Sequence, residues 1–210
     1  NPKDLSFDTY KLVRFQEHNG PNNKPVWHFF PDQCRHCVEP SCMEAADGEA
    51  PGGIIIDSQT GAVLYTDKLN EMNSDDVINA CPFEIPKAQK KTGYLAKCTM
   101  CVDRVHNGLL PACVKTCPTG AMNFGDRNKM AALARGRLTQ AKSRFPRATL
   151  TGLEDLRVFY LLADVPKRYY TYAKVERTPT RMDRKMALRK IGRSLKGLTR
   201  EWDMINKLTG

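Results

Sequence analysis

The sequence predicts an α+β fold in which short β-hairpins and a few helices surround two similar four-cysteine motifs. All eight cysteines fall into two sets, each with three cysteines followed by a fourth that precedes a proline. Fourteen glycines and thirteen prolines among 210 residues predict many turns and short regular elements. A hydrophobic fraction of 41% is lean for this length, so we expect bound groups to complete the core.

The cysteine spacing indicates iron–sulfur clusters. The two motifs are Cys34-x2-Cys37-x4-Cys42 with Cys81-Pro82, and Cys98-x2-Cys101-x11-Cys113-x3-Cys117-Pro118. A [4Fe–4S] cube needs four thiolates, and a Cys-x2-Cys loop can wrap one cube with its backbone. A proline after the fourth cysteine removes a backbone donor and fixes the chain as it leaves the metal. We therefore expect all eight cysteines to be metal ligands, holding two [4Fe–4S] clusters in ferredoxin-like modules that transfer electrons.

Two hairpins are expected around the first motif. Strands at residues 9–15 and 26–30 flank a loop at residues 18–24. Strands at residues 53–56 and 62–65 flank a Gly-containing turn. Such short hairpins are typical of small iron–sulfur modules, in which the metal ligands lie in the connecting loops.

A longer helix and a return strand are expected after the second motif. Asp126 is a suitable N-cap, and residues 157–162 have the composition of a strand. The expected apolar face of the helix consists of Met130, Leu133, Ala134, Leu138 and Ala141. The predicted domains are an iron–sulfur region at 1–125, a helix–strand segment at 126–173 that packs on it, and a basic amphipathic tail helix at 174–210.

The tail carries most of the net charge of +10. Ten basic and three acidic residues between Arg177 and Lys207 account for +7 of it, and apolar residues recur every three or four positions from Leu188 to Ile205. This helix could pack on its own domain, dock on a partner subunit or lie on an anionic membrane surface. Because the rest of the chain is nearly balanced in charge, no nucleic-acid partner is expected.

We expect neither a membrane-spanning segment nor a signal peptide. No apolar run approaches the roughly 20 residues that a transmembrane helix requires. The chain begins with the polar residues Asn1-Pro2-Lys3-Asp4, which lack the apolar core of a signal peptide.

Other functions explain the cysteines less well. Two zinc sites would also use eight thiolates, but zinc ribbons pair one Cys-x2-Cys with another. Disulfide frameworks seldom repeat this spacing, and a thioredoxin-like role for Cys98 and Cys101 would leave Cys113 and Cys117 unexplained. His36 is expected to lie near the first cluster without binding it. No nucleophile, acid–base pair or phosphate loop stands out, so no catalytic residue is expected.

Four stretches resemble the iron–sulfur (beta) subunits of formate dehydrogenases, within the beta subunits that serve molybdenum or tungsten bis-pterin oxidoreductases. The resemblance extends from about Asn1 to Ala173. The stretches are Phe30-Pro-Asp-Gln-Cys34-Arg-His-Cys37, Ala80-Cys-Pro-Phe-Glu-Ile-Pro86, Lys97-Cys-Thr-Met-Cys101-Val-Asp-Arg104 and Pro111-Ala-Cys-Val-Lys-Thr-Cys-Pro-Thr-Gly-Ala-Met-Asn-Phe-Gly125.

One cluster of the larger family members is absent. Glu71, Ser74 and Val77 stand where that cluster's motif would have cysteines, and Ala46 stands at the partner position after Cys42. The resemblance therefore implies a beta subunit of the three-cluster type found in soluble periplasmic formate dehydrogenases.

The family's opening Cys-x2-Cys-x2-Cys-x3-Cys motif is also missing. In the family, Cys98, Cys101 and Cys113 would take their fourth ligand from that motif, and Cys117 would serve the motif's own cluster. Either another segment supplies the motif and adds a third cluster, or Cys117 closes a local cluster here.

The resemblance implies an electron-transfer subunit of a formate dehydrogenase complex in the periplasm, although a cytoplasmic location fits as well. It would relay electrons singly between a tungsten- or molybdenum-pterin catalytic subunit and an acceptor such as a cytochrome. Membrane-bound members end in a transmembrane anchor, whereas this chain ends in the basic tail, which could attach to a partner or a membrane surface. The alternatives are a beta subunit of a nitrate, polysulfide or dimethyl sulfoxide reductase, or a zinc-stapled nucleic-acid-binding module.

Overall fold

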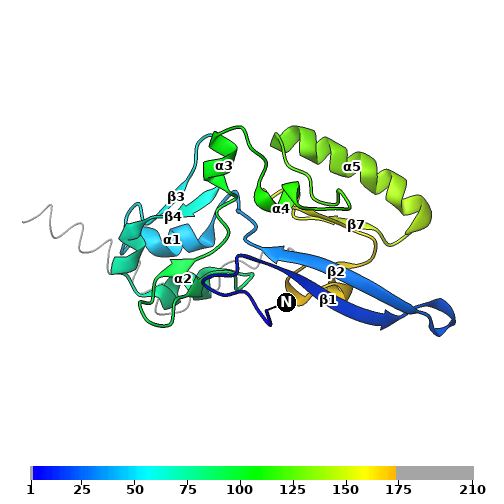
Figure 1. Cartoon of the computed structure of the whole chain (residues 1–210), viewed down its shortest axis with the longest axis horizontal. Coiled ribbons are helices and arrows are strands. Elements are labelled where there is room, and N and C mark those ends of the chain that lie inside the picture. The colour runs from blue at the N-terminus through cyan, green and yellow to red at the C-terminus, as the bar shows by residue number, and fades with distance from the viewer. Residues whose placement is uncertain (1, 174–210) are drawn as a thin grey trace, which may run out of the picture. The chain divides into compact units, whose positions relative to one another are not determined.

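The structure, a computed structural model, describes residues 2–173 and contains four antiparallel two-stranded sheets, each joined locally along the chain (Figure 1). The strands are β1 Lys11–Asn19, β2 Pro25–Gln33, β3 Ile54–Ile56, β4 Val63–Tyr65, β5 Lys87–Ala88, β6 Leu95–Ala96, β7 Thr149–Thr151 and β8 Tyr160–Leu162. The α-helices are α1 Ser41–Asp47, α2 Ser74–Ala80, α3 Val102–His106, α4 Ala112–Lys115 and α5 Arg127–Arg144. Short 3₁₀ turns lie at Pro21–Asn23, Asp67–Glu71, Pro166–Arg168 and Thr171–Ala173. The predicted α+β arrangement of short hairpins and a few helices is confirmed.

The β1–β2 hairpin leads the chain into the first cysteine. Its register runs from Lys11 opposite Gln33 to Asn19 opposite Pro25. Strand β1 therefore begins and ends later than the predicted strand at residues 9–15, and β2 extends beyond the predicted residues 26–30 at both ends. Asn22 and Asn23 turn the chain with positive φ angles of 57° and 58°, a conformation that asparagine tolerates better than most residues. Because β2 ends at Gln33, the paired strand holds the backbone immediately before Cys34.

The β3–β4 hairpin confirms the second predicted pair of strands. Asp57 closes its turn, because its carboxylate accepts hydrogen bonds from the Thr60 amide at 2.7 Å and the Thr60 hydroxyl at 2.6 Å. Gly61 completes the turn with a φ of 72°, which an L-residue with a side chain rarely adopts. The backbone here also leaves room for Arg157, which packs directly against Gly61.

Helix α5 begins where the sequence predicts, but one member of its expected face is wrong. The Asp126 side chain accepts hydrogen bonds from the amides of Asn128 and Lys129, each at 3.1 Å. Leu133 is 37% exposed, whereas Ala131, which was not predicted, is 6% exposed. The buried stripe is therefore rotated toward Ala131, because α5 packs on β7 and β8.

The strand expected at residues 157–162 is confirmed only in its second half. Strand β8 covers Tyr160–Leu162 and pairs with β7. The amides of Arg157 and Val158 instead donate to the carbonyl of Arg35, at 3.2 and 3.0 Å. Residues 157 and 158 therefore pair with the first cysteine loop and do not join the β7–β8 ladder.

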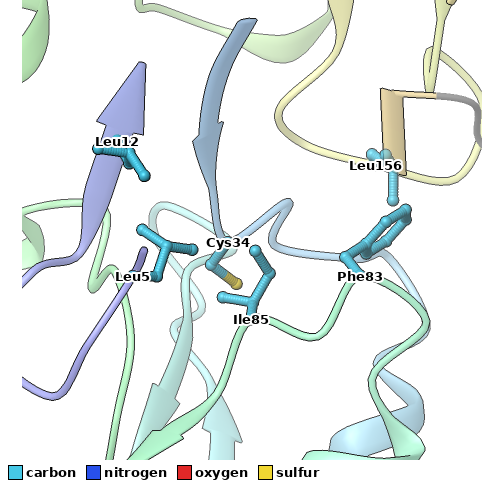
Figure 2. Close-up of a cluster of buried hydrophobic side chains, with 6 residues drawn as sticks. All are labelled: Leu5, Leu12, Cys34, Phe83, Ile85 and Leu156. Carbon is cyan, nitrogen blue, oxygen red and sulfur yellow. The ribbon is translucent and has the colours of Figure 1, made fainter. Parts of the chain in front are cut away.

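Three apolar clusters form the core of the described region. The first surrounds Cys34 and is drawn in Figure 2: its members are Leu5, Leu12, Cys34, Phe83, Ile85 and Leu156. The second joins β2 and β8 through Phe30, Tyr160, Leu162, Tyr169 and Ala173. The third lies between α1, α2 and the β3–β4 hairpin and contains Ala46, Ile54, Val63, Leu69 and Val77. Each cluster is small, as the lean composition predicts.

A buried ion pair lies at the base of the first cysteine loop. Arg35 is 1% exposed, and its guanidinium donates to the Asp32 carboxylate at 2.9 Å. The rings of Phe30, Phe83 and Tyr160 surround the guanidinium at 5.1–5.2 Å from their centroids. Removing one partner of such a pair leaves an uncompensated buried charge, so the pair fixes the loop that carries it.

The predicted tail helix at 174–210 lies outside the described residues. Residues 2–173 belong to one compact unit, and the predicted boundary between 125 and 126 stays a prediction. Within residues 2–173, no helix has both the length and the apolar character of a membrane span.

We expect Asp126→Ala to lower stability by about 1 kcal/mol, because two amides at the start of α5 lose their acceptor. For a region of this size, that corresponds to a fall of about 2–4 °C in the midpoint of thermal unfolding. Circular dichroism at a helix band would measure it. Asp126→Asn, which keeps an accepting oxygen, is the control. An equal fall in both variants would contradict the capping role.

Candidate metal centre

The two Cys-x2-Cys loops adopt the same turn. In the first, His36 has a φ of 45° and its amide donates to the sulfur of Cys34 at 3.4 Å. In the second, Met100 has a φ of 59° and its amide donates to the sulfur of Cys98 at 3.4 Å. In both loops, therefore, the residue two positions after the first cysteine has a left-handed backbone conformation, and its amide donates to the sulfur of that cysteine. The internal repeat seen in the sequence is also a structural repeat.

A segment from the distant C-terminal part of the unit clamps the first loop. Cys37 forms an isolated β-bridge with Leu156, and the amide of Val38 donates to the Asp155 carbonyl at 2.9 Å. The guanidinium of Arg157 donates to the Cys37 carbonyl at 2.6 Å. The loop is thus held by backbone and side-chain hydrogen bonds from residues 155–157.

Two helices position the remaining cysteines of the first motif. Cys42 is the second residue of α1, and Cys81 directly follows α2. Helices α1 and α2 pack together through Ala46 and Val77, which are both 0% exposed. Cys81 packs against the apolar cluster that contains Cys34, and Cys42 packs against the cluster that contains Ala46 and Val77.

The four thiols of the first motif lie close enough to influence one another. Burial raises the pKa of Cys37 to about 12, and the neighbouring Cys34 and Cys81 raise it further. Burial, with Cys34 and Cys81 again adding to it, raises the pKa of Cys42 to about 12. Burial also raises the pKa of Cys81, and Cys34 contributes. We call these four cysteines, Cys34, Cys37, Cys42 and Cys81, the first group.

The second motif gathers around Lys11. Burial lowers the pKa of Lys11, and the thiols of Cys113, Cys98 and Cys117 act against that shift. Burial raises the pKa of Cys98 to about 11, with contributions from Cys34 and Cys113. Cys101 lies at the start of α3 with a φ of 50°. We call Cys98, Cys101, Cys113 and Cys117 the second group.

Cys117 differs from the other thiols. The Thr119 hydroxyl, 3.5 Å from its sulfur, lowers the pKa of Cys117 to about 7, and the Met122 and Ala121 amides add to the effect. Among the cysteines with a shifted pKa, Cys117 is therefore the one that forms a thiolate most easily near neutral pH. Such a thiol is ready to bind a metal without the help of a neighbouring cation.

The donor chemistry of the first group suits a multinuclear iron–sulfur cube. All eight cysteines are free thiols. Within residues 2–173, no three His, Cys, Asp or Glu side chains lie close enough together to hold a single metal ion. A cube separates its thiolates more widely than one ion does, because iron and sulfide lie between them. Such a cube requires four thiolates, and the first group supplies four cysteines.

Two buried polar atoms near the first group have no hydrogen-bond partner within residues 2–173. They are the hydroxyl of Tyr65 and Nε2 of His36. The His36 Nδ1 accepts from the Val63 amide at 3.0 Å, so the proton lies on Nε2. Burial raises the pKa of Tyr65 well above its usual range, and Cys42, Cys34 and Cys81 contribute. The Tyr65 hydroxyl therefore lies near the Cys42 thiol, where a sulfur-rich group would accept its hydrogen bond.

Sequence reasoning missed two residues of this site. Lys97 is 6% exposed, and its ammonium lies 4.5 Å from the centroid of the Tyr65 ring. Lys97 immediately precedes the second Cys-x2-Cys, and this position in the sequence could have identified it as a residue of the site. Tyr65 ends a strand far from any cysteine in the sequence, and only the packing of β4 brings it close.

Comparison with known proteins agrees with this chemistry. The family described as "4Fe-4S dicluster domain" matches residues 25–127. Over 176 residues the chain is 51% identical to the beta subunit of formate dehydrogenase 2 (cytochrome c-553) from Nitratidesulfovibrio vulgaris, which covers 82% of this chain and 80% of that protein. It is 48% identical over 174 residues to a formate dehydrogenase beta subunit from Megalodesulfovibrio gigas, with coverage of 82% and 80%. It is 39% identical over 176 residues to the nitrate-inducible formate dehydrogenase iron–sulfur subunit of Escherichia coli, covering 81% of this chain and 58% of that protein.

We expect Gly61→Ala to weaken the first group. A Cβ at Gly61 would come within 2.7 Å of Cδ of Arg157 and displace the side chain that binds the Cys37 carbonyl. Loss of one hydrogen bond from a charged donor costs about 1.5–3 kcal/mol. Iron should therefore be lost faster from the protein when an iron chelator is added, as followed by absorbance.

Gly93→Ala is the matched control. Gly93 has a φ of 74°, close to the 72° of Gly61, but nothing lies within 4 Å of a Cβ placed there. Both substitutions strain the backbone equally, and only one displaces Arg157. Equal rates of iron loss in the two variants would show that the Arg157 contact does not support the site.

Proposed function

Because this chain belongs to the family of formate dehydrogenase iron–sulfur (beta) subunits, we propose that its two groups of cysteines form the electron path of such a complex. It is an electron-transfer subunit with [4Fe–4S] clusters, and the observation that carries the assignment is the 51% identity across most of both chains. Each cube, when bound, carries one electron at a time. Apolar side chains pack around Cys34, Cys37, Cys81 and Cys98, where they hold the ligands and exclude water.

The first group is proposed as one complete ligand set. Its four thiols influence one another's pKa, and they come from a loop and two helices that pack together. The raised pKa values of Cys37, Cys42 and Cys81 mean that these three thiols stay protonated at neutral pH in the metal-free chain. Binding must therefore release protons, and the positive charge of iron has to compensate for the thiolates that form.

The second group is proposed to hold another cube, with two possible fourth ligands. Cys98, Cys113 and Cys117 approach Lys11, which supports a local site closed by Cys117. Alternatively, a segment supplied from elsewhere provides the fourth ligand, and Cys117 serves a third cube, as the family pattern implies. A Cys117→Ser variant that loses one cube while keeping the second group's cube would favour the second arrangement.

The partners follow from the relatives. A catalytic subunit that holds the tungsten or molybdenum pterin would deliver electrons from formate, and a cytochrome would accept them, as the name of one relative includes cytochrome c-553. We propose a periplasmic location, because the missing motif at Glu71, Ser74 and Val77 resembles the three-cluster periplasmic type. Docking of the tail on a partner or membrane surface remains a prediction about residues outside the described part.

We expect Cys81→Ser and Cys98→Ser each to remove one cube and to leave the other in place. The two cysteines belong to different groups, and each variant removes one corner thiolate from its own group. Iron and acid-labile sulfide, counted per chain in the purified complex, would each fall by about four atoms in either variant. Unchanged iron in Cys81→Ser would reject Cys81 as a ligand.

Formate should reduce the clusters of the intact complex. Under anaerobic conditions, adding formate should bleach the broad visible absorbance and produce electron paramagnetic resonance signals of reduced cubes. Dithionite reduces clusters directly, so it gives the total amount of reducible cluster in the sample. Reduction by dithionite alone, with no response to formate, would favour a partner enzyme that uses another substrate, such as nitrate or polysulfide.

A further inference from the structure

Lys97 is a buried cation that the proposed electron path leaves unexplained. It is 6% exposed, and its ammonium donates to the carbonyls of Val63 and Cys98, the latter at 3.2 Å. It also lies over the Tyr65 ring. None of the ion pairs that the structure shows within residues 2–173 involves Lys97. A buried positive charge surrounded by neutral groups is costly unless a negative charge lies nearby.

Another buried cation of the site is compensated within the protein. Arg35 faces the Asp32 carboxylate at 2.9 Å. Its charge is therefore largely balanced before any cluster binds. Lys97 differs from Arg35 because its hydrogen-bond acceptors are carbonyl oxygens, which carry no net charge. The negative charge that balances Lys97 has to come from the thiolates and the group they bind.

The ammonium of Lys97 lies against segments that carry both groups of cysteines. It donates to the carbonyl of Cys98, a member of the second group, at 3.2 Å. It also donates to the carbonyl of Val63, which belongs to the apolar cluster that Cys42 packs against. The Val63 amide in turn donates to Nδ1 of His36 at 3.0 Å, inside the first Cys-x2-Cys loop.

Both groups also contact one apolar cluster. Cys34 belongs to the core with Phe83 and Ile85, and Cys37, Cys81 and Cys98 pack against that core. Little water separates the two groups there, so a charge placed between them is weakly screened. A single lysine in such a place acts on two sites at once.

We propose that Lys97 is a shared positive charge that raises the reduction potential of the clusters on both groups. The proposal rests on the proposed function, because it requires a cube on each group. Reduction adds one negative charge to a cluster, and a nearby buried cation stabilises the reduced state. Lys97 binds no iron itself, and it acts on the potentials alone.

The test is a redox titration of the intact complex, prepared anaerobically and followed by electron paramagnetic resonance. The signals that disappear in Cys81→Ser identify the first group, and those that disappear in Cys98→Ser identify the second. In Lys97→Met, which keeps an unbranched side chain without the charge, both sets of signals should shift to lower potential. Lys97→Arg, which keeps the charge, should leave both near their original values.

Two further lysines serve as matched controls. Lys91 is exposed in the β5–β6 turn, so Lys91→Met removes the same charge from a screened position and should shift neither group. Lys11 acts on Cys98, Cys113 and Cys117, so Lys11→Met should shift the second group alone. Together the three substitutions distinguish a shared charge from a local one and from a change in net charge.

Unchanged potentials in Lys97→Met, or a shift confined to one group, would overturn the proposal. So would a shift in Lys97→Arg as large as that in Lys97→Met, since the charge would then be irrelevant. If Lys97→Met does not retain iron, Lys97→Gln gives the same comparison, because its amide can still donate to the two carbonyls. Failure of the proposed function looks different: the unaltered complex would then show no reducible cluster signal, and the proposal on Lys97 would fail with it.

Discussion

The central constraint on this structure is the cost of bringing thiols together in a partly buried place. Cys37 and Cys42 have pKa values of about 12 because of burial and neighbouring sulfurs. Thiols with such raised pKa values become thiolates when a positively charged group binds them together. The fold therefore supplies geometry and the metal supplies charge. The left-handed turns, the Arg157 clamp and the packing of α1 on α2 all hold the cysteines in position.

An apolar core occupies the positions at which the family resemblance implies a further cluster in larger members. Ala46 and Val77 stand at two of these positions, and both are 0% exposed in the third apolar cluster. Glu71, at a third such position, is exposed. Side chains of Ile54, Val63 and Leu69 complete that cluster. Helices α1 and α2 are thus held together by hydrophobic burial, and the thiols of Cys42 and Cys81 stay in position without an adjacent cube.

Much of this architecture could be predicted from the sequence, because its signals are local. Turn residues fix the β1–β2 and β3–β4 hairpins, Asp126 caps α5, and the cysteine spacing identifies the cluster chemistry. The errors arise where distant segments compete for the same groups. Leu133 was expected on the buried face, but the contact of α5 with β7 and β8 selects Ala131 instead. Residues 157 and 158 resemble a strand, yet their amides bind the first cysteine loop.

The surroundings of the thiols could not be predicted for the same reason. Tyr65 and Arg157 are far from the first loop in sequence, and neither belongs to a recognisable motif. Tertiary packing alone brings the Tyr65 hydroxyl near Cys42 and the Arg157 guanidinium to the Cys37 carbonyl. Motif spacing thus identifies the ligands and the metal chemistry, whereas the groups that would set the properties of the bound cube come from segments with no local signal.

The most direct test is the metal content of the unaltered protein, purified anaerobically with its partners. Iron, acid-labile sulfide and zinc should be measured on the same sample, together with the visible spectrum. The account predicts iron and sulfide in equal amounts, enough for at least two cubes on this chain, with the broad brown absorbance that such cubes give. Stoichiometric zinc in a colourless protein that lacks sulfide would contradict it.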